Sequence, residues 1–391
     1  MTLTRAQATF PPPIVAARRW LDGVEFPPDR PLINVSQAAP VAPPPQELRL
    51  VMADVALNDD SAHLYGPDLG MPELRAEIAA QWSAHYGGTI TPAQVAITSG
   101  CNQAFAAAIH ALTGEGDEVI LPTPWYFNHK MWLDMCGVKA VALPAGAGML
   151  PDPDQAAALI GPRTRAIALV SPNNPAGVEY PADLVRAFYD LAKARGIRLI
   201  LDETYRDFDA RSGAVHDLFT DPDWPDTLID LYSFSKAYRL TGHRVGAIIA
   251  SKALLDEVEK FIDSVTICPN QIGQHAALWG MQNLGQWLAG ERAEILDRRA
   301  AIEEGFPALA AEGWKLLGLG AYFAYVEHPF DMPSDTLAQA LVKEAGVLLL
   351  PATMFVPEGD PTGQRHLRIA FANLDRAGIG TMFGRLTGLK L

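Results

Sequence analysis

The sequence predicts an α/β protein with a mostly parallel, mixed sheet covered by helices on both faces, together with a smaller α+β domain. Short apolar runs rich in β-branched residues alternate with helical stretches between residues 94 and 250. Several of these runs are apolar over most of their length, as expected for strands covered by helices on both faces. After about residue 275 the pattern changes to long helices followed by shorter strand-like runs.

The length of the chain favours two domains, because 391 residues exceed what one hydrophobic core usually serves. We place the large domain at residues 46–285 and form the small one from residues 286–391 and an N-terminal arm, residues 1–45. The arm is rich in proline, which predicts an extended segment lying on the rest of the protein. A disordered tail over roughly the first ten residues is the alternative.

A clear helix of the large domain begins after Gly70. Pro72 suits its first turn, apolar residues recur at every fourth position, and Gly87 ends it. Further helices are expected at 101–112 and 182–195, between strands at 94–98, 118–121, 138–143, 165–170, 197–201, 228–232 and 245–250. In the small domain we expect helices at 272–289 and 291–311 and strands at 321–326, 347–350 and 366–371.

The composition disfavours several kinds of partner. Lys and Arg total 31 against 45 Asp and Glu, and the resulting net charge of −14 disfavours nucleic acid. The three cysteines are scattered, with no C-x-x-C pair, so neither a metal site nor a disulfide framework is expected. No run approaches the roughly 18 apolar residues of a membrane helix, and residues 1–20 lack the apolar core of a signal peptide. We therefore expect a cytoplasmic protein with small-molecule ligands.

Polar and reactive residues follow four of the predicted strands. Ligands of doubly wound sheets sit beyond the carboxyl ends of the strands, so these residues are expected to share one site. Because strand ends are often polar, any one of these residues could be there without a functional reason. That explanation is weaker for the whole set. They are Gly100 after the first strand, Asn173 and Asn174 after the fourth, Asp202 after the fifth, and Ser233, Ser235 and Lys236 after the sixth.

The segment TSGCNQAF, residues 98–105, is suited to binding an anion. Gly100 makes the turn from strand to helix, and the N–H groups of Cys101 and Asn102 would point outward from the helix N-terminus. A single glycine in a turn is commonplace, so this signal is weak alone. The absence of a G-x-G-x-x-G or Walker motif counts against a dinucleotide or ATP.

The segment SFSKAYRLTGHRVG, residues 233–246, carries the richer chemistry. Ser233, Ser235 and Arg244 can bind phosphate oxygens, with the arginine supplying a planar fork. Lys236 can form a Schiff base with an aldehyde, although a solvated loop lysine is the plainer interpretation. Asp202 directly follows a buried strand, and a carboxylate there needs a partner. A pyridinium nitrogen and the cationic side chain of a structural ion pair are equally suited to this role.

Four motifs together resemble those of the class I/II aminotransferases, which are fold-type I pyridoxal-phosphate-dependent enzymes. The resemblance runs from about residue 30 to the C-terminus and implies a fold-type I architecture with pyridoxal 5'-phosphate as cofactor. It also implies the transfer of an amino group from an L-amino acid to a 2-oxo acid by a ping-pong mechanism. The motifs are YGPDLGMPELR (65–75), SPNNPAG (171–177), LDETY (201–205) and SFSKAYRLTGHRVG (233–246).

The resemblance implies a role for each residue of the catalytic centre. Lys236 would carry the cofactor as a Schiff base and, once displaced by the substrate amine, would act as the base in the proton shift. Asp202 would keep the ring nitrogen protonated. Tyr205 and Asn174 resemble the residues that hydrogen-bond the ring hydroxylate.

Further residues resemble the family's cofactor-binding positions. The phosphate group would be held by Ser233, Arg244, Gly100 and the Cys101–Asn102 backbone, with Ser235 as a weaker candidate. Tyr126 falls where the family stacks an aromatic ring on the cofactor, whereas the adjacent Trp125 is interpreted as pocket wall or core. His129 sits where a histidine contacts the aspartate, and a core histidine is its alternative.

Substrate binding and assembly are also implied. Arg368 resembles the arginine that clamps the substrate α-carboxylate, with Asn174 and Ala38 beside it. Tyr65 resembles a tyrosine that reaches the cofactor of the neighbouring subunit, so a homodimer is expected. Ala38 and Ala352 stand where the family usually has glycine, and their methyl groups would narrow the pocket.

Other outcomes remain open at the sequence level. A lyase acting by β-elimination, such as a C–S lyase, a decarboxylase or a synthase would use the same fold and site. A non-catalytic regulatory module that binds pyridoxal phosphate is a more remote alternative, because the chain offers no DNA-binding segment. The aromatic residues Tyr65, Trp125, Tyr126 and Phe355 favour an aromatic or apolar substrate.

Overall fold

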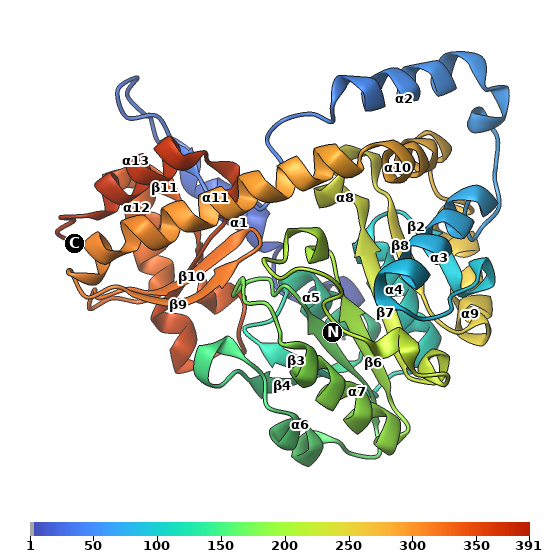
Figure 1. The fold of residues 1–391 in the computed structure, drawn as a ribbon. Helices are drawn as coiled ribbons and strands as arrows, with labels where there is room; N and C mark the ends of the chain where they lie inside the picture. The colour runs from blue at the N-terminus through green and yellow to red at the C-terminus, as the bar shows by residue number, and fades with distance from the viewer. Residues whose placement is uncertain (1–3) are drawn as a thin grey trace.

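The computed structural model describes residues 4–391 and confirms the predicted fold class. Its centre is a seven-stranded mixed sheet with helices on both faces, and the smaller lobe formed by the C-terminal part lies beside it (Figure 1). The strand order is β2-β8-β7-β6-β5-β3-β4. The strands are β2 (Val95–Thr98), β3 (Glu118–Thr123), β4 (Lys139–Pro144), β5 (Thr164–Val170), β6 (Arg198–Asp202), β7 (Leu228–Ser233) and β8 (Gly246–Ile249).

Helices cover both faces of the sheet, so its strands are buried on both sides. Successive residues of a strand point to opposite faces and therefore pack against different helices. One face, including Leu169 and Leu201, packs against α3 (Pro72–Tyr86), α7 (Ala182–Arg195) and α10 (Gln271–Asn283). The other face, including Ala168 and Ile200, packs against α4 (Cys101–Leu112), α5 (Phe127–Cys136) and α9 (Lys252–Thr266). A shorter helix, α6 (Pro153–Leu159), adds Ala156 to the first face. These two apolar layers hold the sheet rigid beneath its edge.

The direction of one strand determines which segments meet at the edge of the sheet. Strand β8 runs antiparallel to both of its neighbours, β2 and β7, whereas β7, β6, β5, β3 and β4 pair in parallel. The amino end of β8 therefore lies beside the carboxyl ends of β2 and β7. This brings the segment before β8, which contains Arg244, to the same edge as Asp202 and Lys236.

The smaller lobe is built on an antiparallel sheet of order β12-β13-β10-β9. Its strands are β9 (Lys315–Gly320), β10 (Phe323–Glu327), β12 (Leu350–Pro351) and β13 (His366–Ile369), and its helices are α12 (Ser334–Ala345) and α13 (Arg376–Leu386). The N-terminal arm joins this lobe, because β1 (Ile33–Asn34) pairs in parallel with β11 (Val347–Leu348). The division of the chain at residues 45 and 285 stays a prediction.

Several details of the smaller lobe differ from the sequence prediction, which did not include α12 or α13. The expected helix break near residue 290 is wrong, because α11 (Gly285–Ala310) begins directly after Leu284 and continues through Gly290. A glycine inside an exposed helix costs only about 1 kcal/mol, which the packing of this long helix outweighs. Strand β9 was not predicted.

The N-terminal arm is partly helical instead of extended throughout. It contains α1 (Pro13–Arg18), and a longer helix, α2 (Gln46–Asn58), follows it and packs against α10, with Leu48 in the core of the large domain. Of the predicted tail, residues 1–3 lie outside the described residues. Residues 4–10 lie against the large sheet's helices, where Arg5 pairs with Glu115 at 2.8 Å and Thr9 Oγ1 donates to Asp134 at 3.1 Å.

A group of buried acids lies under the sheet edge on the α3 side. Trp82 Nε1 donates to Asp230 Oδ2 at 2.7 Å, and the hydroxyl of Tyr86 donates to Glu203 Oε2 at 2.5 Å. Burial, together with the charge of Glu203, raises the pKa of Asp230 well above the ordinary carboxyl range. Asp230 is therefore the protonated member of this pair. Within residues 4–391, no helix is both long and apolar enough to cross a membrane.

Candidate active site

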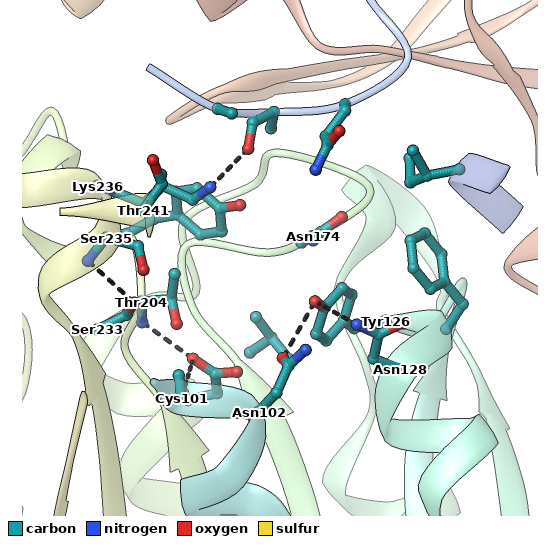
Figure 2. Close-up of a pocket in the computed structure, with 18 of the residues that line it drawn as sticks. Cys101, Asn102, Tyr126, Asn128, Asn174, Thr204, Ser233, Ser235, Lys236 and Thr241 are labelled. Atoms are coloured by element: carbon teal, nitrogen blue, oxygen red, sulfur yellow. Dashed lines mark hydrogen bonds between the residues drawn. The ribbon is translucent and has the colours of Figure 1, made fainter. Parts of the chain in front are cut away.

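A cavity of about 310 Å³ opens at the carboxyl edge of the large sheet, between this edge and the N-terminal segment (Figure 2). Most of the predicted site residues line it, and those that do not are Gly100, Tyr65, Asn173 and His129. They arrive from β6, β7, the turns after β2 and β5, and strand β13 of the smaller lobe. The structure thus brings together segments that are more than 300 residues apart, such as Ala38 and Arg368.

Lys236 projects into this cavity from α8 (Phe234–Ala237), the short helix that follows β7. Its Nζ donates to the backbone oxygen of Ala38 at 2.5 Å. Burial, helped by the positive charges of Arg244 and Arg368, lowers the pKa of Lys236 to about 8. About a tenth of this amine is therefore neutral, and nucleophilic, at pH 7, far more than for an ordinary lysine.

Asp202 ends β6 at the base of the cavity and is almost completely buried. Burial by itself would raise its pKa, but His129 and Thr204 outweigh this effect and hold the pKa below the ordinary value. His129 Nε2 lies 3.3 Å from Oδ2, and the Thr204 N–H donates to Oδ1 at 3.0 Å. The thiol of Cys101 also donates to Oδ1, at 3.5 Å. Asp202 is therefore a buried carboxylate that can receive a cationic N–H group.

An anion cradle lies at the N-terminus of α4. Gly100 has φ of 85°, and a Cβ at this position would clash with the guanidinium group of Arg244. Gly246 is needed as well, since a Cβ there would lie 2.7 Å from the Cys101 nitrogen. The first N–H groups of α4 have no carbonyl partner within the helix. Gly100 thus lets Arg244 approach the helix N-terminus closely, and Gly246 lets β8 pack against the same turn, an arrangement suited to a phosphate group.

Two serines complete this cradle. Ser233 accepts a hydrogen bond from the Ser235 N–H at 3.2 Å as the N-cap of α8, which leaves its hydroxyl hydrogen free to donate. Arg244 Nη1 donates to Ser235 Oγ at 3.3 Å and to the Thr241 oxygen at 3.1 Å. Arg244 itself has φ of 53°, a strained conformation that the surrounding bonds maintain. The donors in this cradle therefore fit the phosphate of pyridoxal phosphate, and Asp202 fits its ring nitrogen.

Arg368 also lines the cavity and is almost completely buried, with an exposed fraction of 2%. It donates through Nη1 to Asn174 Oδ1 at 3.0 Å and through Nη2 to the backbone oxygen of Ser36, while its buried Nε has no partner within residues 4–391. Burial lowers its pKa to about 10, so the guanidinium still carries its charge at neutral pH. It is therefore ready to bind a carboxylate, and the bond from Arg368 turns the NH₂ group of Asn174 toward the cavity.

Aromatic side chains form the walls of the cavity. Tyr126 accepts a hydrogen bond from Asn128 Nδ2 at 3.0 Å and donates to Asn102 Oδ1 at 3.3 Å. Burial raises its pKa to about 12, so it is an un-ionised phenol. Tyr205 lines the cavity too, and Lys236 Nζ lies 5.9 Å from the centre of its ring.

Several expectations at the edge of the site are changed by the structure. Tyr65 lies outside the cavity, with an exposed fraction of 79%. Ala352 packs with Ala176 and Tyr325 in a separate apolar cluster, so the expectation that its methyl group narrows the pocket is wrong. Ala38 does line the cavity. Trp125 belongs to the core under the sheet.

Other residues of the cavity were missed by the sequence analysis. Asn128 was not considered although it lies two residues after Tyr126, and Thr204 was passed over between Asp202 and Tyr205. Thr241, Phe127 and Ile14 carry no signal of their own, because a threonine in a loop or an apolar residue on a helix is unremarkable without the fold. Asn173, in contrast, fixes its own loop, where its Oδ1 accepts from the Ala176 N–H at 2.9 Å.

Comparison with known proteins agrees with this geometry. The family model for aminotransferase class I and II matches residues 30–386. A valine–pyruvate aminotransferase of Mycobacterium tuberculosis is 30% identical over 353 residues, 87% of each protein, and an aromatic aminotransferase of Arabidopsis thaliana is 29% identical over 331 residues, 82% of this chain and 80% of that protein. A single mutant of the aspartate aminotransferase of Thermus thermophilus superposes with a TM-score of 0.88, at 25% identity and with 99% of each chain covered. The chain belongs to the class I and II aminotransferases, a family of pyridoxal-phosphate-dependent enzymes.

Proposed function

We propose that this aminotransferase carries pyridoxal phosphate on Lys236 and moves an amino group from an L-amino acid to a 2-oxo acid by a ping-pong mechanism. The convergence of two cations, the partly buried Lys236 and the buried Arg368, with the carboxylate of Asp202 and the cradle at Arg244 in one cavity carries the proposal. The phosphate would lie against Arg244, the two serines and the N-terminus of α4. The pyridine nitrogen would meet Asp202.

The residues around the cofactor would act mainly by controlling protons. When bound, pyridoxal phosphate supplies a conjugated ring that accepts the electron pair left when the substrate Cα–H bond breaks. Asp202, kept ionised by its neighbours, holds a proton on the ring nitrogen. Lys236 Nζ removes the proton from Cα and can return it to a neighbouring atom, a role suited to an amine with a pKa of about 8. Asn174 and Tyr205 would donate hydrogen bonds to the ring oxygen.

Arg368 would orient the substrate. Its guanidinium group would bind the α-carboxylate through two parallel hydrogen bonds and so fix the direction of the Cα–H bond relative to Lys236. The same clamp serves the amino acid and the 2-oxo acid, because both carry a carboxylate on the reacting carbon. Ala38, whose carbonyl faces Lys236 at 2.5 Å, would border the bound substrate.

Two spectroscopic measurements test the proposal. The purified protein should be yellow, lose this absorbance when an amino acid is added, and regain it only with a 2-oxo acid. Release of ammonia or thiol without a 2-oxo acid would instead establish lyase chemistry. The Lys236→Ala variant should lose the covalently bound cofactor's absorbance, whereas Lys252→Ala, on the surface of α9, should keep it.

We further propose that two copies of the chain form the active unit, with Tyr65 reaching the neighbouring copy's site. Large apolar side chains are exposed along residues 41–65, at Val41, Leu50, Leu57, Leu64 and Tyr65. They lie on and around α2 (Figure 1). Such a patch supports contact with another protein surface. Mixing inactive Lys236→Ala and Tyr65→Ala proteins should restore activity if each site uses both chains, and no restoration would contradict a shared site.

We propose a cytoplasmic location. Cys101, Cys136 and Cys268 are all free thiols, as is usual in reducing compartments. Cell fractionation with an antibody to the protein tests this proposal, and recovery from an extracytoplasmic fraction would refute it.

A further inference from the structure

A second, apolar cavity of about 160 Å³ opens beside the candidate active site. Phe105 of α4 and three residues of α5, Met131, Trp132 and Met135, form most of its lining. Asn102 and Asn128 line both cavities, so the two spaces adjoin at these residues. We call this space the side pocket.

The shared rim lies on the side of the active-site cavity away from Lys236 in the close-up view (Figure 2). There, Tyr126 joins Asn102 and Asn128 through hydrogen bonds of 3.3 Å and 3.0 Å. The Cα of a bound substrate must approach Lys236, and its carboxylate must approach Arg368. The side chain is the remaining substituent, and the side pocket gives it a path away from both cations.

The floor of the side pocket is rigid and its wall is adaptable. Phe105 and His129 are stacked at 3.7 Å with an interplanar angle of 12°, and both are almost completely buried. Met131 and Met135 are only partly buried, and their flexible thioether chains can adjust to a ligand. Within residues 4–391, no Lys, Arg, Asp or Glu lines the pocket.

We propose that the side pocket receives the side chain of an aromatic or thioether amino acid, an assignment that rests on the proposed aminotransferase function. Its volume is close to that of an apolar protein cavity of about 150 Å³ that binds benzene. A carboxylate side chain would lose its hydration there without gaining a charged partner, which is unfavourable. Ile14 and Phe127 of the main cavity are the competing location for the side chain.

Filling the side pocket tests the proposal through a ratio of substrates. In Met135→Trp, the ratio of kcat/KM for phenylalanine to that for alanine should fall roughly 10–200-fold, the usual range for lost apolar contacts in a pocket. The matched variant Leu159→Trp, on the surface of α6, should keep the wild-type ratio. An unchanged ratio in Met135→Trp, or a fall in Ile14→Trp alone, would overturn the proposal. If Met135→Trp does not fold, Met135→Ala should raise the ratio of tryptophan to alanine, and an unchanged ratio there would likewise refute it.

Binding of unreactive acids separates this proposal from the function on which it rests. 3-Phenylpropionate and propionate both present a carboxylate to Arg368, but only the first carries a ring. Calorimetry on the holoenzyme measures the binding of each acid. Met135→Trp should weaken the binding of 3-phenylpropionate at least about tenfold more than the binding of propionate. If no amino acid is transaminated, this comparison still tests the pocket. If transamination occurs and Met135→Trp weakens the binding of both acids equally, only the assignment of the side pocket is wrong.

Discussion

Replacing Arg368 by glutamine is expected to remove the enzyme's preference for substrates that carry an α-carboxylate. Arg368 is buried and charged, and its Nε has no partner within residues 4–391. Glutamine keeps a donor that can reach Asn174 but loses both the charge and the planar fork. The substitution therefore removes the carboxylate clamp while retaining much of the local packing.

The size of the effect follows from the two bonds that are lost. A hydrogen bond to a charged group contributes about 1.5–3 kcal/mol, so a two-bond clamp contributes about 3–6 kcal/mol. Each 1.36 kcal/mol corresponds to about a tenfold change in rate, which gives a loss of roughly 10²–10⁴-fold in kcat/KM. The side chain is almost fully shielded from water, so solvent competes little for these bonds.

The assay compares phenylalanine with 2-phenylethylamine, which lacks the carboxylate. Arg368→Gln should lose activity toward phenylalanine by the factor above and keep most of its activity toward the amine. Arg365→Gln is the matched control, because Arg365 lies three residues away and donates to the backbone oxygens of Phe330 and His328 outside the cavity. If Arg368→Gln lowered both activities by the same factor, Arg368 would be a structural residue and the clamp would be refuted.

Three further predictions concern the cofactor site and the core. Cofactor-free protein should bind pyridoxal phosphate faster as pH rises, and the rate should level off above a pH of about 8. The reason is that the pKa of Lys236 is about 8 and only the neutral amine attacks an aldehyde. A stopped-flow rate that does not depend on pH would contradict this prediction. The raised pKa of Asp230 should make the wild-type protein less stable as pH rises above the ordinary carboxyl range, whereas Asp230→Asn lacks this titration. In urea titrations the unfolding free energy of Asp230→Asn relative to wild type should therefore increase by about 1.4 kcal/mol per pH unit in this range. A difference that does not depend on pH would refute the prediction. Gly100→Ala should weaken pyridoxal phosphate binding at least about tenfold in absorbance titrations, because the new methyl group displaces Arg244. Gly148→Ala, at φ of 65° in open space, is the control, and an equal loss there would assign the effect to backbone strain.

The sequence predicts the large sheet well because its strands are buried on both faces. Residues 166–170 and 199–201 are apolar without interruption, as expected for strands that lie between two layers of helices. Strand β9, KLLGLG, has no such run, since two of its six residues are glycine. A Cβ on Gly318 would clash with the Ala176 oxygen, and one on Gly320 would clash with the Gly177 oxygen. These glycines are required by packing against a distant loop, which cannot be inferred from the local pattern.

The two halves of the candidate site differ in the same way. The cofactor half comes from consecutive strand ends of one sheet, so the order of the strands brings Asp202, Lys236 and the Gly100 turn to one edge. Its residues also have unusual chemistry for their positions, which made them visible in the sequence. The carbonyl groups of Ser36 and Ala38, which accept from Arg368 and Lys236, have no such signal, because every residue carries a carbonyl.

The substrate half depends instead on how separate parts of the chain pack together. Arg368 reaches the cavity from β13 of the smaller lobe, Ile14 from α1 of the arm, and Met135 of the side pocket from α5. Residues such as Ile14 and Met135 form no part of the cofactor cradle, so they can change without loss of the amino-transfer chemistry. The family motifs therefore specify the reaction, whereas the choice of substrate must be inferred from the apolar surfaces of α1 and α5, where the side-pocket variants test it.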